Sequence, residues 1–350
     1  MRAVLIREHG GLDKLAVEDV EQPRPVRGEA LVRVAAAGLN RMDLFLRTGL
    51  TGPGVRQAPL PHVPGVEAAG HLEELGPDTS AAAPLGERVV MYSGLSCGHC
   101  RHCRTGREGR CPQYRIIGED VWGTQAEYVI VPARNLMTVP DYVPLHHAAA
   151  APIAFATAWT MLVSAAQVQV GERVLVVGAS GGVATAAMAI ARRTGARVLA
   201  GTRGADKVAR LAELGLADDI LDTTQPQWHR EVLAVTGGLG ADIVVDAVGA
   251  PTWRESIRSL APDGRMVICG ATGGDNPDIS IREVYQSHRR IIGAPLGGWT
   301  DFHDAMTLVL RGELEPVIHT TMPLENVADA HRLMEAGEHL GKILLTVSED

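Results

Sequence analysis

Four of the chain's five cysteines lie in one short stretch, in a pattern typical of metal binding. Residues 96–111 read SCGHCRHCRTGREGRC, which spaces the cysteines as C-x2-C-x2-C-x7-C. Four thiolates complete a tetrahedral shell around Zn²⁺ and leave no position for water or substrate. His99 and His102 lie between the cysteines and could compete as ligands. We predict one structural zinc ion per chain, held by Cys97, Cys100, Cys103 and Cys111.

A second stretch, VLVVGASGGVATAAMAI, has the order strand, glycine turn, helix. If the turn at 178–182 binds a dinucleotide, its glycines let the pyrophosphate reach the helix N-terminus, where free N–H groups and the helix dipole favour anions. GASGG also matches G-x-S-x-G, the nucleophile elbow of serine hydrolases. Ser180 would then be the nucleophile, and Asp246 and a later histidine such as His319 follow in hydrolase order. A plain βα turn is the third interpretation, because short motifs often match by chance.

The next predicted strand favours the dinucleotide. RVLAG ends 23 residues after Gly178, where a dinucleotide fold meets the adenosine ribose. A sequence that binds NAD would carry an acidic residue there, but this chain has Thr202 and Arg203, followed by Lys207. A hydroxyl and two cations suit a 2′-phosphate, which needs charge-assisted donors, and a hydrolase has no use for them. The alternative is that both cations are solvated loop charges.

We therefore predict NADP(H) as the cofactor. Gly249 and Gly270 end predicted parallel strands, at the edge where open α/β sheets bind ligands. The predicted cofactor-binding residues of this half of the chain are Gly178, Ala179, Ser180, Gly181, Gly182, Val183, Thr202, Arg203, Lys207, Gly249 and Gly270.

The elements that must position these residues fall into two halves with different rhythms. Up to about residue 140, short apolar runs such as EALVRVAAAG and AEYVIVPA alternate with turns rich in Pro and Gly, which predicts a mostly antiparallel β domain. From about residue 170, strand-like runs alternate with helical ones, which predicts βαβ units and a parallel sheet. The final LENVADAHRLMEAGEHLGKILLTV is one helix and one strand, and it could close onto either half.

Composition excludes several classes of function. The formal net charge of −8 argues against a nucleic-acid partner, because a phosphate backbone is bound by clustered Lys and Arg. The basic cluster HCRTGREGR lies inside the cysteine loop, and we expect Glu108 to offset it. The uncharged stretch 148–166 is rich in alanine and contains Pro152, so we expect a buried helix rather than a membrane span. No signal peptide is evident, which predicts a cytoplasmic protein whose clustered cysteines bind metal.

A β domain, a cysteine lobe, a dinucleotide fold and a closing helix and strand, in this order, resemble the medium-chain dehydrogenase/reductase superfamily. Matching stretches extend over essentially the whole chain and include AAAGLNRMDLFLRTG, HVPGVEAAGHLEELG, GTQAEYVIVP, VVDAVG and LGKILL. The chain is most similar to the quinone oxidoreductase and enone reductase branch, with the structural-zinc lobe of alcohol dehydrogenases retained. The resemblance implies an α/β fold with a GroES-like catalytic domain at 1–141 and 294–350, the zinc lobe at 93–112, and a Rossmann-type, doubly wound NADP(H)-binding domain at 142–293.

Zinc alcohol dehydrogenases of this superfamily carry a second, catalytic zinc, and this chain lacks its ligands. Asn40 stands where the cysteine of a G-x-C-x-x-D segment belongs, and Val66 replaces the histidine of a G-H-E triplet. The helix near residue 153 offers no further ligand, and Met42 stands where a hydroxyl would relay the proton of an alcohol. We therefore expect no catalytic zinc.

The resemblance implies roles for four further residues. An Asn is usual at position 40 in this branch; its amide could donate to a substrate carbonyl or to the nicotinamide ribose, or Asn40 could only cap the following helix. Asp43 more simply orients that turn than touches substrate. Thr157 matches a family threonine near the cofactor, or it bonds its own helix. Lys342 matches a family lysine near the phosphate end of the cofactor.

The expected function is NADPH-dependent reduction of an activated double bond in an enone, enal or enoyl compound, or of a quinone. Alternatives are an alcohol dehydrogenase with a divergent zinc site, a protein that binds NADPH without turnover, and a serine hydrolase that uses Ser180. The expected partner is a small-molecule substrate, with no nucleic acid and no membrane. Relatives pair through the edge strands of their nucleotide domains, so a homodimer or homotetramer is expected by resemblance.

Overall fold

The computed structural model describes residues 1–52 and 55–348, and it divides the chain into two compact units. Unit 1 is Met1–Ile153 with Gly298–Asp350, and unit 2 is Ala154–Gly297. The first division thus lies twelve residues beyond the predicted boundary at 141. The reason is α2 (Leu145–Ala149), whose buried Leu145 and alanines pack on β3 and β4 of unit 1.

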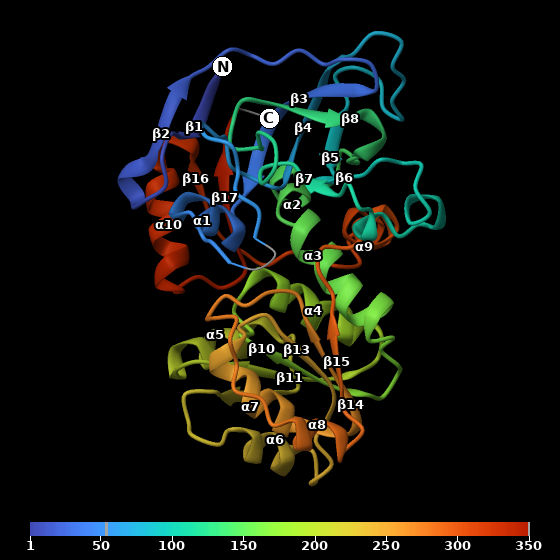
Figure 1. Ribbon diagram of the computed structural model, residues 1–350, viewed down its shortest axis with the longest axis vertical. Coiled ribbons are helices and arrows are strands. Elements are labelled where there is room, and N and C mark those ends of the chain that lie inside the picture. Colours follow the sequence, from blue (N-terminus) through green and yellow to red (C-terminus); the bar gives the residue numbers. More distant parts are fainter. Residues whose placement is uncertain (53–54, 349–350) are drawn as a thin grey trace. The chain divides into compact units, whose positions relative to one another are not determined.

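Unit 1 is built on a seven-stranded sheet, with the order β16-β17-β3-β4-β5-β9 and β8 paired to β3 (Figure 1). All of its pairs are antiparallel except β16 with β17, which agrees with the predicted β domain. Its core gathers small and branched apolar side chains of these strands, for example Val32, Val89 and Ile343. The strands are β3 (Glu29–Gly38), β4 (Ala68–Leu75), β5 (Arg88–Met91), β8 (Tyr128–Pro132), β9 (Leu136–Thr138), β16 (Ile318–Pro323) and β17 (Lys342–Thr346).

Smaller elements surround this sheet. The hairpin β1 (Arg2–Ile6) and β2 (Leu15–Asp19) and the short pair β6 (Gly94–Leu95) and β7 (Arg115–Ile116) form two further sheets. Besides α2, the described part of unit 1 contains the α-helices α1 (Arg41–Thr48), α9 (Trp299–Leu310) and α10 (Val327–Ala336), and several short 3₁₀ helices.

The C-terminal helix and strand close onto unit 1. β17 pairs antiparallel with β3, where Leu344 faces Gly38 and Leu345 faces Ala37. Ile343, Leu344 and Leu345 are fully buried. The sequence left this choice between the two halves open, because an amphipathic helix and an apolar strand would suit either core.

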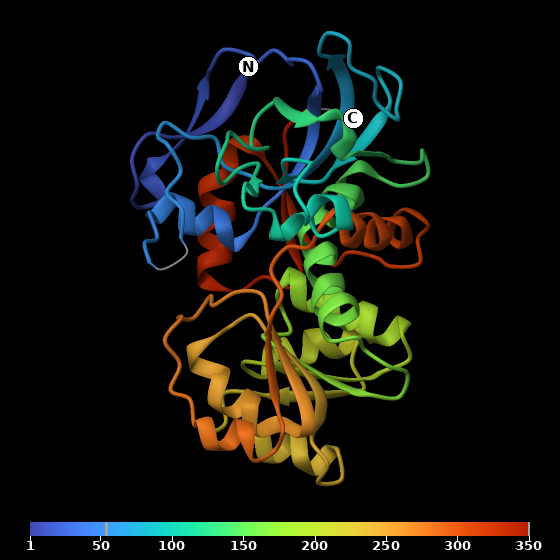
Figure 2. The same ribbon diagram turned by 45° about the vertical axis from the view of Figure 1, so that its right-hand side comes forward.

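Unit 2 contains a six-stranded sheet with the order β12-β11-β10-β13-β14-β15, and every pair in it is parallel. In Figure 2 the unit runs from green to orange, with its helices packed around the strands. Its elements are α3 (Pro152–Trp159, which begins in unit 1), β10 (Arg173–Val177), α4 (Gly182–Arg193), β11 (Arg197–Thr202), α5 (Ala205–Leu214), β12 (Asp219–Asp222), α6 (His229–Val235), β13 (Ala241–Asp246), α7 (Ala250–Ser259), β14 (Leu260–Ile268), α8 (Ile281–Tyr285) and β15 (Arg290–Gly293).

The uncharged stretch 148–166 is divided among α2, α3 and a π-helical segment, Thr160–Ala165. Over the residues that the structure describes, no helix combines the length and the apolar character needed to cross a membrane.

Candidate functional site

The glycine turn lies at the point where the strand order of unit 2 reverses. β10 is central; the chain next builds β11 and β12 on one side of it and then β13 to β15 on the other. Gly178 follows β10 and has a φ of +71°, a left-handed conformation that glycine adopts without strain. Gly181 caps α4, a twelve-residue helix whose N-terminus begins at this edge of the sheet. Open α/β sheets bind ligands at such a switch point, and a helix N-terminus there suits a pyrophosphate.

The cations predicted to bind a 2′-phosphate follow the neighbouring strand β11. Lys207 Nζ donates to Ser180 Oγ at 3.3 Å, so this ammonium lies beside the glycine turn. Arg203 is exposed, whereas Thr202 is buried and its carbonyl accepts bonds from Thr223. The donor set fits a dinucleotide: a glycine turn, a helix N-terminus and two cations at the carboxyl edge of a parallel sheet.

An acidic residue that the sequence analysis did not single out borders the same loop. Asp222 ends β12, and its Oδ1 accepts the backbone N–H groups of Gly204 at 3.1 Å and Thr224 at 3.0 Å. The N–H of Thr224, and then that of Gly204, lower the pKa of this carboxyl. A negative charge therefore lies next to the loop that carries Arg203. The alternation of strands could have identified Asp222, because parallel strands end at one edge of a sheet.

The structure does not arrange Asp246 for a serine hydrolase. Its Oδ1 accepts the backbone N–H groups of Val248 and Gly249, and its Oδ2 accepts the hydroxyls of Thr252 at 2.7 Å and Ser256 at 2.6 Å. Asp246 is fully buried, and these four donors occupy both oxygens. Its role is to fix the turn after β13.

The two predicted glycines at strand ends differ in their surroundings. Gly249 has a φ of +91°, and a Cβ on it would lie 2.4 Å from the carbonyl oxygen of Gly274. Only glycine therefore fits that turn. Gly270 is exposed after β14, and a Cβ there would make only one distant contact, at 3.9 Å.

The four clustered cysteines have the geometry of a zinc site. Their sulfur atoms all lie within 4.8 Å of one another; Cys97 Sγ is 3.9 Å and Cys100 Sγ is 3.5 Å from Cys103 Sγ. Sulfurs at the corners of a zinc tetrahedron, with Zn–S bonds of about 2.3 Å, are about 3.8 Å apart. The N–H of Cys100 donates to Cys97 Sγ, and the N–H groups of His99 and Cys100 lower the pKa of Cys97 to about 6. The site therefore favours thiolates, and Cys111 completes its ligand set.

The loop that holds this cluster is more basic at its surface than the sequence suggested. Glu108 does not offset the arginines around it, because its carboxylate turns inward toward the N-terminus of α9. A Cβ on Gly298 would lie 2.6 Å from Glu108 Oε2, which is buried without a hydrogen-bond partner. The arginines of the loop, Arg101, Arg104, Arg107 and Arg110, are all exposed.

Asn40 lies in a network of charged groups within unit 1. Lys342 Nζ donates to Asn40 Oδ1 and to the carbonyl of Leu39, each at 2.8 Å, and it lies 2.5 Å from Glu67 Oε1. Asn40 Nδ2 donates to the same Glu67 oxygen at 2.8 Å and approaches the carbonyl of Gly38 at 3.4 Å. Lysine only donates and a carboxylate only accepts, so this pair fixes the orientation of the amide.

The ion pair of Lys342 and Glu67 is almost completely buried, with side chains 5% and 0% exposed. The second oxygen of Glu67 accepts the N–H of Ile153 at 2.8 Å. Glu67 is the third residue of the segment in which Val66 replaces the histidine of a G-H-E triplet, and no role was predicted for it. A carboxylate inside the apolar run HVPGVEAAGHL was the signal that could have revealed it, because buried carboxylates need a partner.

Asp43 positions this corner and does not face substrate. Asn40 is the residue before α1, and Asp43 Oδ2 accepts its backbone N–H at 2.7 Å. Asp43 Oδ1 accepts the N–H of Gly65 at 2.9 Å. Burial raises the pKa of this carboxyl to about 7, against the lowering effect of the two N–H groups and of Lys342. Asn40 is thus the N-cap residue of α1, and its side chain is turned toward Lys342.

The structure places the remaining predicted residues in unit 2. Thr157 lies on α3 and is buried, and Val183 lies in the first turn of α4. No third ligand accompanies Asn40 and Glu67: Val66 is buried and apolar, and over residues 1–52 and 55–348 the four cysteines are the one group with metal-ligating geometry.

Comparisons with known proteins agree with both units. The sequence profile of the alcohol dehydrogenase GroES-like domain matches residues 26–141, and that of the zinc-binding dehydrogenases matches residues 182–311. A solved NAD-dependent alcohol dehydrogenase is 39% identical, with a TM-score of 0.94 over 99% of this chain and 100% of the other. The chain belongs to the medium-chain dehydrogenase/reductase superfamily.

Curated relatives of this superfamily match over the same length. The human quinone oxidoreductase is 29% identical over 99% of this chain and 97% of its own. A zinc-type alcohol dehydrogenase-like protein of Schizosaccharomyces pombe is 29% identical over 99% of both chains. This medium-chain dehydrogenase/reductase is therefore an oxidoreductase, with the GroES-like and Rossmann-like folds that its sequence predicted.

Proposed function

We propose that this protein uses NADPH to reduce an α,β-unsaturated carbonyl compound or a quinone, without a catalytic zinc. The observation that carries the proposal is the buried ammonium of Lys342, bound by Asn40 and Glu67. In this corner the ammonium of Lys342 already neutralises the carboxylate of Glu67. The amide of Asn40 and the isopropyl group of Val66 stand where two zinc ligands would be. A tight Lewis-acid site needs three protein ligands.

The amide of Asn40 can stabilise a developing oxyanion. Reduction of a conjugated double bond places hydride on the β-carbon and spreads negative charge onto the carbonyl oxygen. NADPH, when bound, supplies that hydride. Asn40 Nδ2 donates to Glu67 at 2.8 Å and to the carbonyl of Gly38 at 3.4 Å, and a substrate oxygen could replace this longer, weaker bond. Lys342 donates to Asn40 Oδ1, which polarises the amide and makes its N–H a stronger donor.

Three residues of unit 2 support NADPH as the cofactor. Lys207 lies at the glycine turn. Thr202 ends β11, and the exposed Arg203 follows it. Cations bind a phosphate dianion more strongly than a ribose hydroxyl. The adenosine end of NADPH would lie at this edge, with its 2′-phosphate near Arg203 and Lys207.

An NADH-dependent alcohol dehydrogenase is the second candidate. It is favoured by the 39% identical relative of that name and by Asp222, whose carboxylate borders the loop of Arg203. Alcohol oxidation requires stabilisation of an alkoxide, for which this corner offers an amide rather than zinc.

A substrate panel tests the two candidates. Enones, enals, enoyl thioesters, quinones and simple alcohols would be assayed with each cofactor, before and after dialysis against a chelator. We expect NADPH oxidation with an enone or a quinone that survives the chelator. Alcohol oxidation that the chelator abolishes in folded protein would favour the second candidate, and tight NADPH binding without turnover across the panel would indicate a non-catalytic protein.

A further inference from the structure

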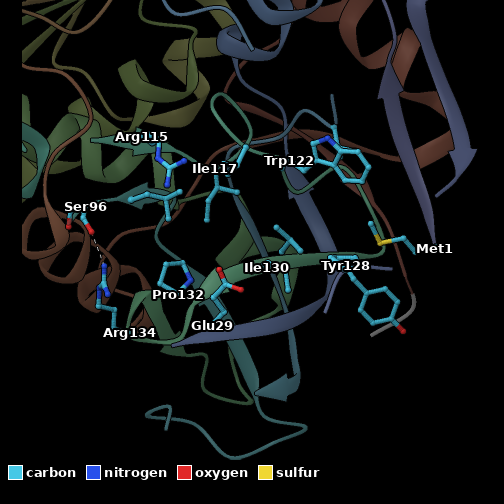
Figure 3. A pocket seen from close by; sticks show the side chains of 16 residues that line it. Met1, Glu29, Ser96, Arg115, Ile117, Trp122, Tyr128, Ile130, Pro132 and Arg134 are labelled. Atoms are coloured by element: carbon cyan, nitrogen blue, oxygen red, sulfur yellow. Dashed lines mark hydrogen bonds between the residues drawn. The ribbon is translucent and has the colours of Figure 1, made fainter. Parts of the chain in front are cut away.

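A groove in unit 1 lies apart from the Asn40 network and shares no residue with it. Its volume is about 360 Å³, at the small end of the range for small-molecule sites. Figure 3 shows its two ends: Arg115, Arg134 and Ser96 lie at one, and Trp122, Tyr128 and Met1 at the other. Ile117 and Ile130 line the space between them.

The basic end holds two arginines that lack carboxylate partners. Arg115 lies on β7 and Arg134 follows β8; both are exposed. Arg134 Nη2 donates to the carbonyl of Ser96 at 3.0 Å, and within residues 1–52 and 55–348 neither guanidinium pairs with an acid. Many other arginines of this acidic protein do pair, for example Arg173 with Asp242. Unpaired guanidinium groups at one end of a groove are suited to a carboxylate or phosphate.

The other end presents apolar surface in a fixed orientation. Trp122 is 40% exposed, and its indole N–H donates to the carbonyl of Pro61 at 3.1 Å. This bond holds an exposed aromatic ring at the mouth of the groove instead of leaving it mobile. Val63, Ile117 and Val129, all nearly fully buried, contribute the apolar floor. Exposed apolar surface that is bordered by charged groups is typical of ligand-binding and interaction sites.

Glu29 restricts where a negative group of a ligand can lie in this groove. Its Oε2 accepts the N–H of Val26 at 3.0 Å, and the side chain lies beside Pro132 between the two ends. The charged side chains of the lining are two arginines and one glutamate, while the N-terminal ammonium of Met1 at the other end donates to the carbonyl of Val20. Two guanidinium groups at one end suit one anionic group of a ligand, and the glutamate repels an anion from the middle of the groove. The negative group must therefore lie at the arginine end.

We propose that this groove binds a monoanionic carboxylate with an apolar tail, such as a medium-chain fatty acid. The carboxylate lies at Arg115 and Arg134, and the tail extends along Ile117 and Ile130 toward Trp122. This inference does not depend on the reaction proposed above, because it concerns a separate part of unit 1.

Isoleucine methyl NMR with decanoate tests the site directly. In protein labelled at isoleucine δ1 methyl groups, decanoate should shift the signals of Ile117 and Ile130 in a saturable way. Ile117→Val and Ile130→Val identify the two signals by removing them one at a time. Decyltrimethylammonium, which has the same tail and the opposite charge, should not produce these shifts.

Three charge variants separate the predicted site from adsorption to any apolar surface. Arg134→Gln should weaken decanoate binding about tenfold, as the loss of a charge-assisted pair does. Glu29→Gln should strengthen binding severalfold, and Arg104→Gln, an exposed arginine outside the groove, should leave it unchanged. No shift at Ile117 and Ile130 at millimolar decanoate, equal shifts with the cationic probe, or equal binding by wild type and Arg134→Gln would each overturn the proposal.

Discussion

Asn40 is the residue on which the proposed chemistry depends, because its amide is held between an ammonium and a carboxylate. Asn40→Ala should lower kcat for an enone by about 10²-fold, as the loss of one oxyanion donor does. NADPH affinity should change little, because the glycine turn and the cations expected to bind its phosphates lie in unit 2. Asn326→Ala, which replaces the asparagine before α10, is the matched control. If folded Asn40→Ala has an unchanged kcat, the amide of Asn40 does not stabilise the transition state.

Arg203 is the residue that tests the choice of cofactor. Arg203→Ala should raise the KM for NADPH about tenfold and leave the KM for NADH nearly unchanged, because only NADPH carries the 2′-phosphate. Arg197→Ala, at the start of the strand that Arg203 follows, is the control, since Arg197 pairs with Asp219 at the surface. Equal use of both cofactors by the unmutated protein would show that Arg203 and Lys207 are solvated charges.

His331 on α10 makes stability depend on pH. It is fully buried and neither ring nitrogen has a hydrogen-bond partner. Burial, and then the charge of Arg47, lower its pKa to about 3, whereas the unfolded chain titrates near 6.5. Between these values the unfolded state binds the extra proton, so stability is present above pH 6.5 and falls as the pH decreases toward 3.

Because of His331, the free energy of unfolding should be about 3 kcal/mol lower at pH 4 than at pH 7. His331→Leu should remove that part of the acid sensitivity, measured by urea unfolding at both pH values. The comparison of variant with wild type also isolates this effect from that of Asp43, whose raised pKa makes stability fall as the pH rises from 4 to 7. Parallel stability curves for the two proteins would contradict the assignment.

At the scale of elements, the cysteine lobe links metal binding to α9. Glu108 meets Gly298, the residue before that helix, and the predicted zinc ligands Cys103 and Cys111 lie on either side of Glu108. Cys103→Ser should therefore remove zinc and lower the melting temperature, because structural zinc contributes to folding. kcat of the protein that remains folded should not change. Cys269→Ser, outside the cluster, is the control and should keep one zinc per chain by elemental analysis. Two zinc ions per chain in active wild type would contradict the prediction of a single, structural zinc.

The sequence predicted those elements whose residues are close together along the chain. The cysteine lobe and the glycine turn are local patterns, and both have the expected geometry in the structure. The pair of Lys342 and Glu67 joins residues far apart in sequence, and so does the contact of Glu108 with Gly298. Neither follows from periodicity or spacing. The boundary near residue 153 also depends on a tertiary contact, the packing of α2 on β3 and β4.

At the scale of the whole molecule, the superfamily fixes the two folds but contains both alcohol dehydrogenases and quinone oxidoreductases among the relatives of this chain. The fold therefore does not choose the reaction, and the choice rests on the site. Here the site offers a polarised amide and a buried ammonium, which suit a delocalised oxyanion better than an alkoxide. The central claim is thus that hydride reaches carbon in the absence of a catalytic metal.

Deuteride transfer tests this claim most directly. Protein with one zinc per chain would reduce an enone with NADPH that carries deuterium at the transferable position, and the product would be analysed by NMR. We predict deuterium on the β-carbon of a saturated ketone, at a rate that a chelator does not change. Deuterium on the carbonyl carbon of an allylic alcohol, at a rate that follows the occupancy of a second zinc, would contradict the account.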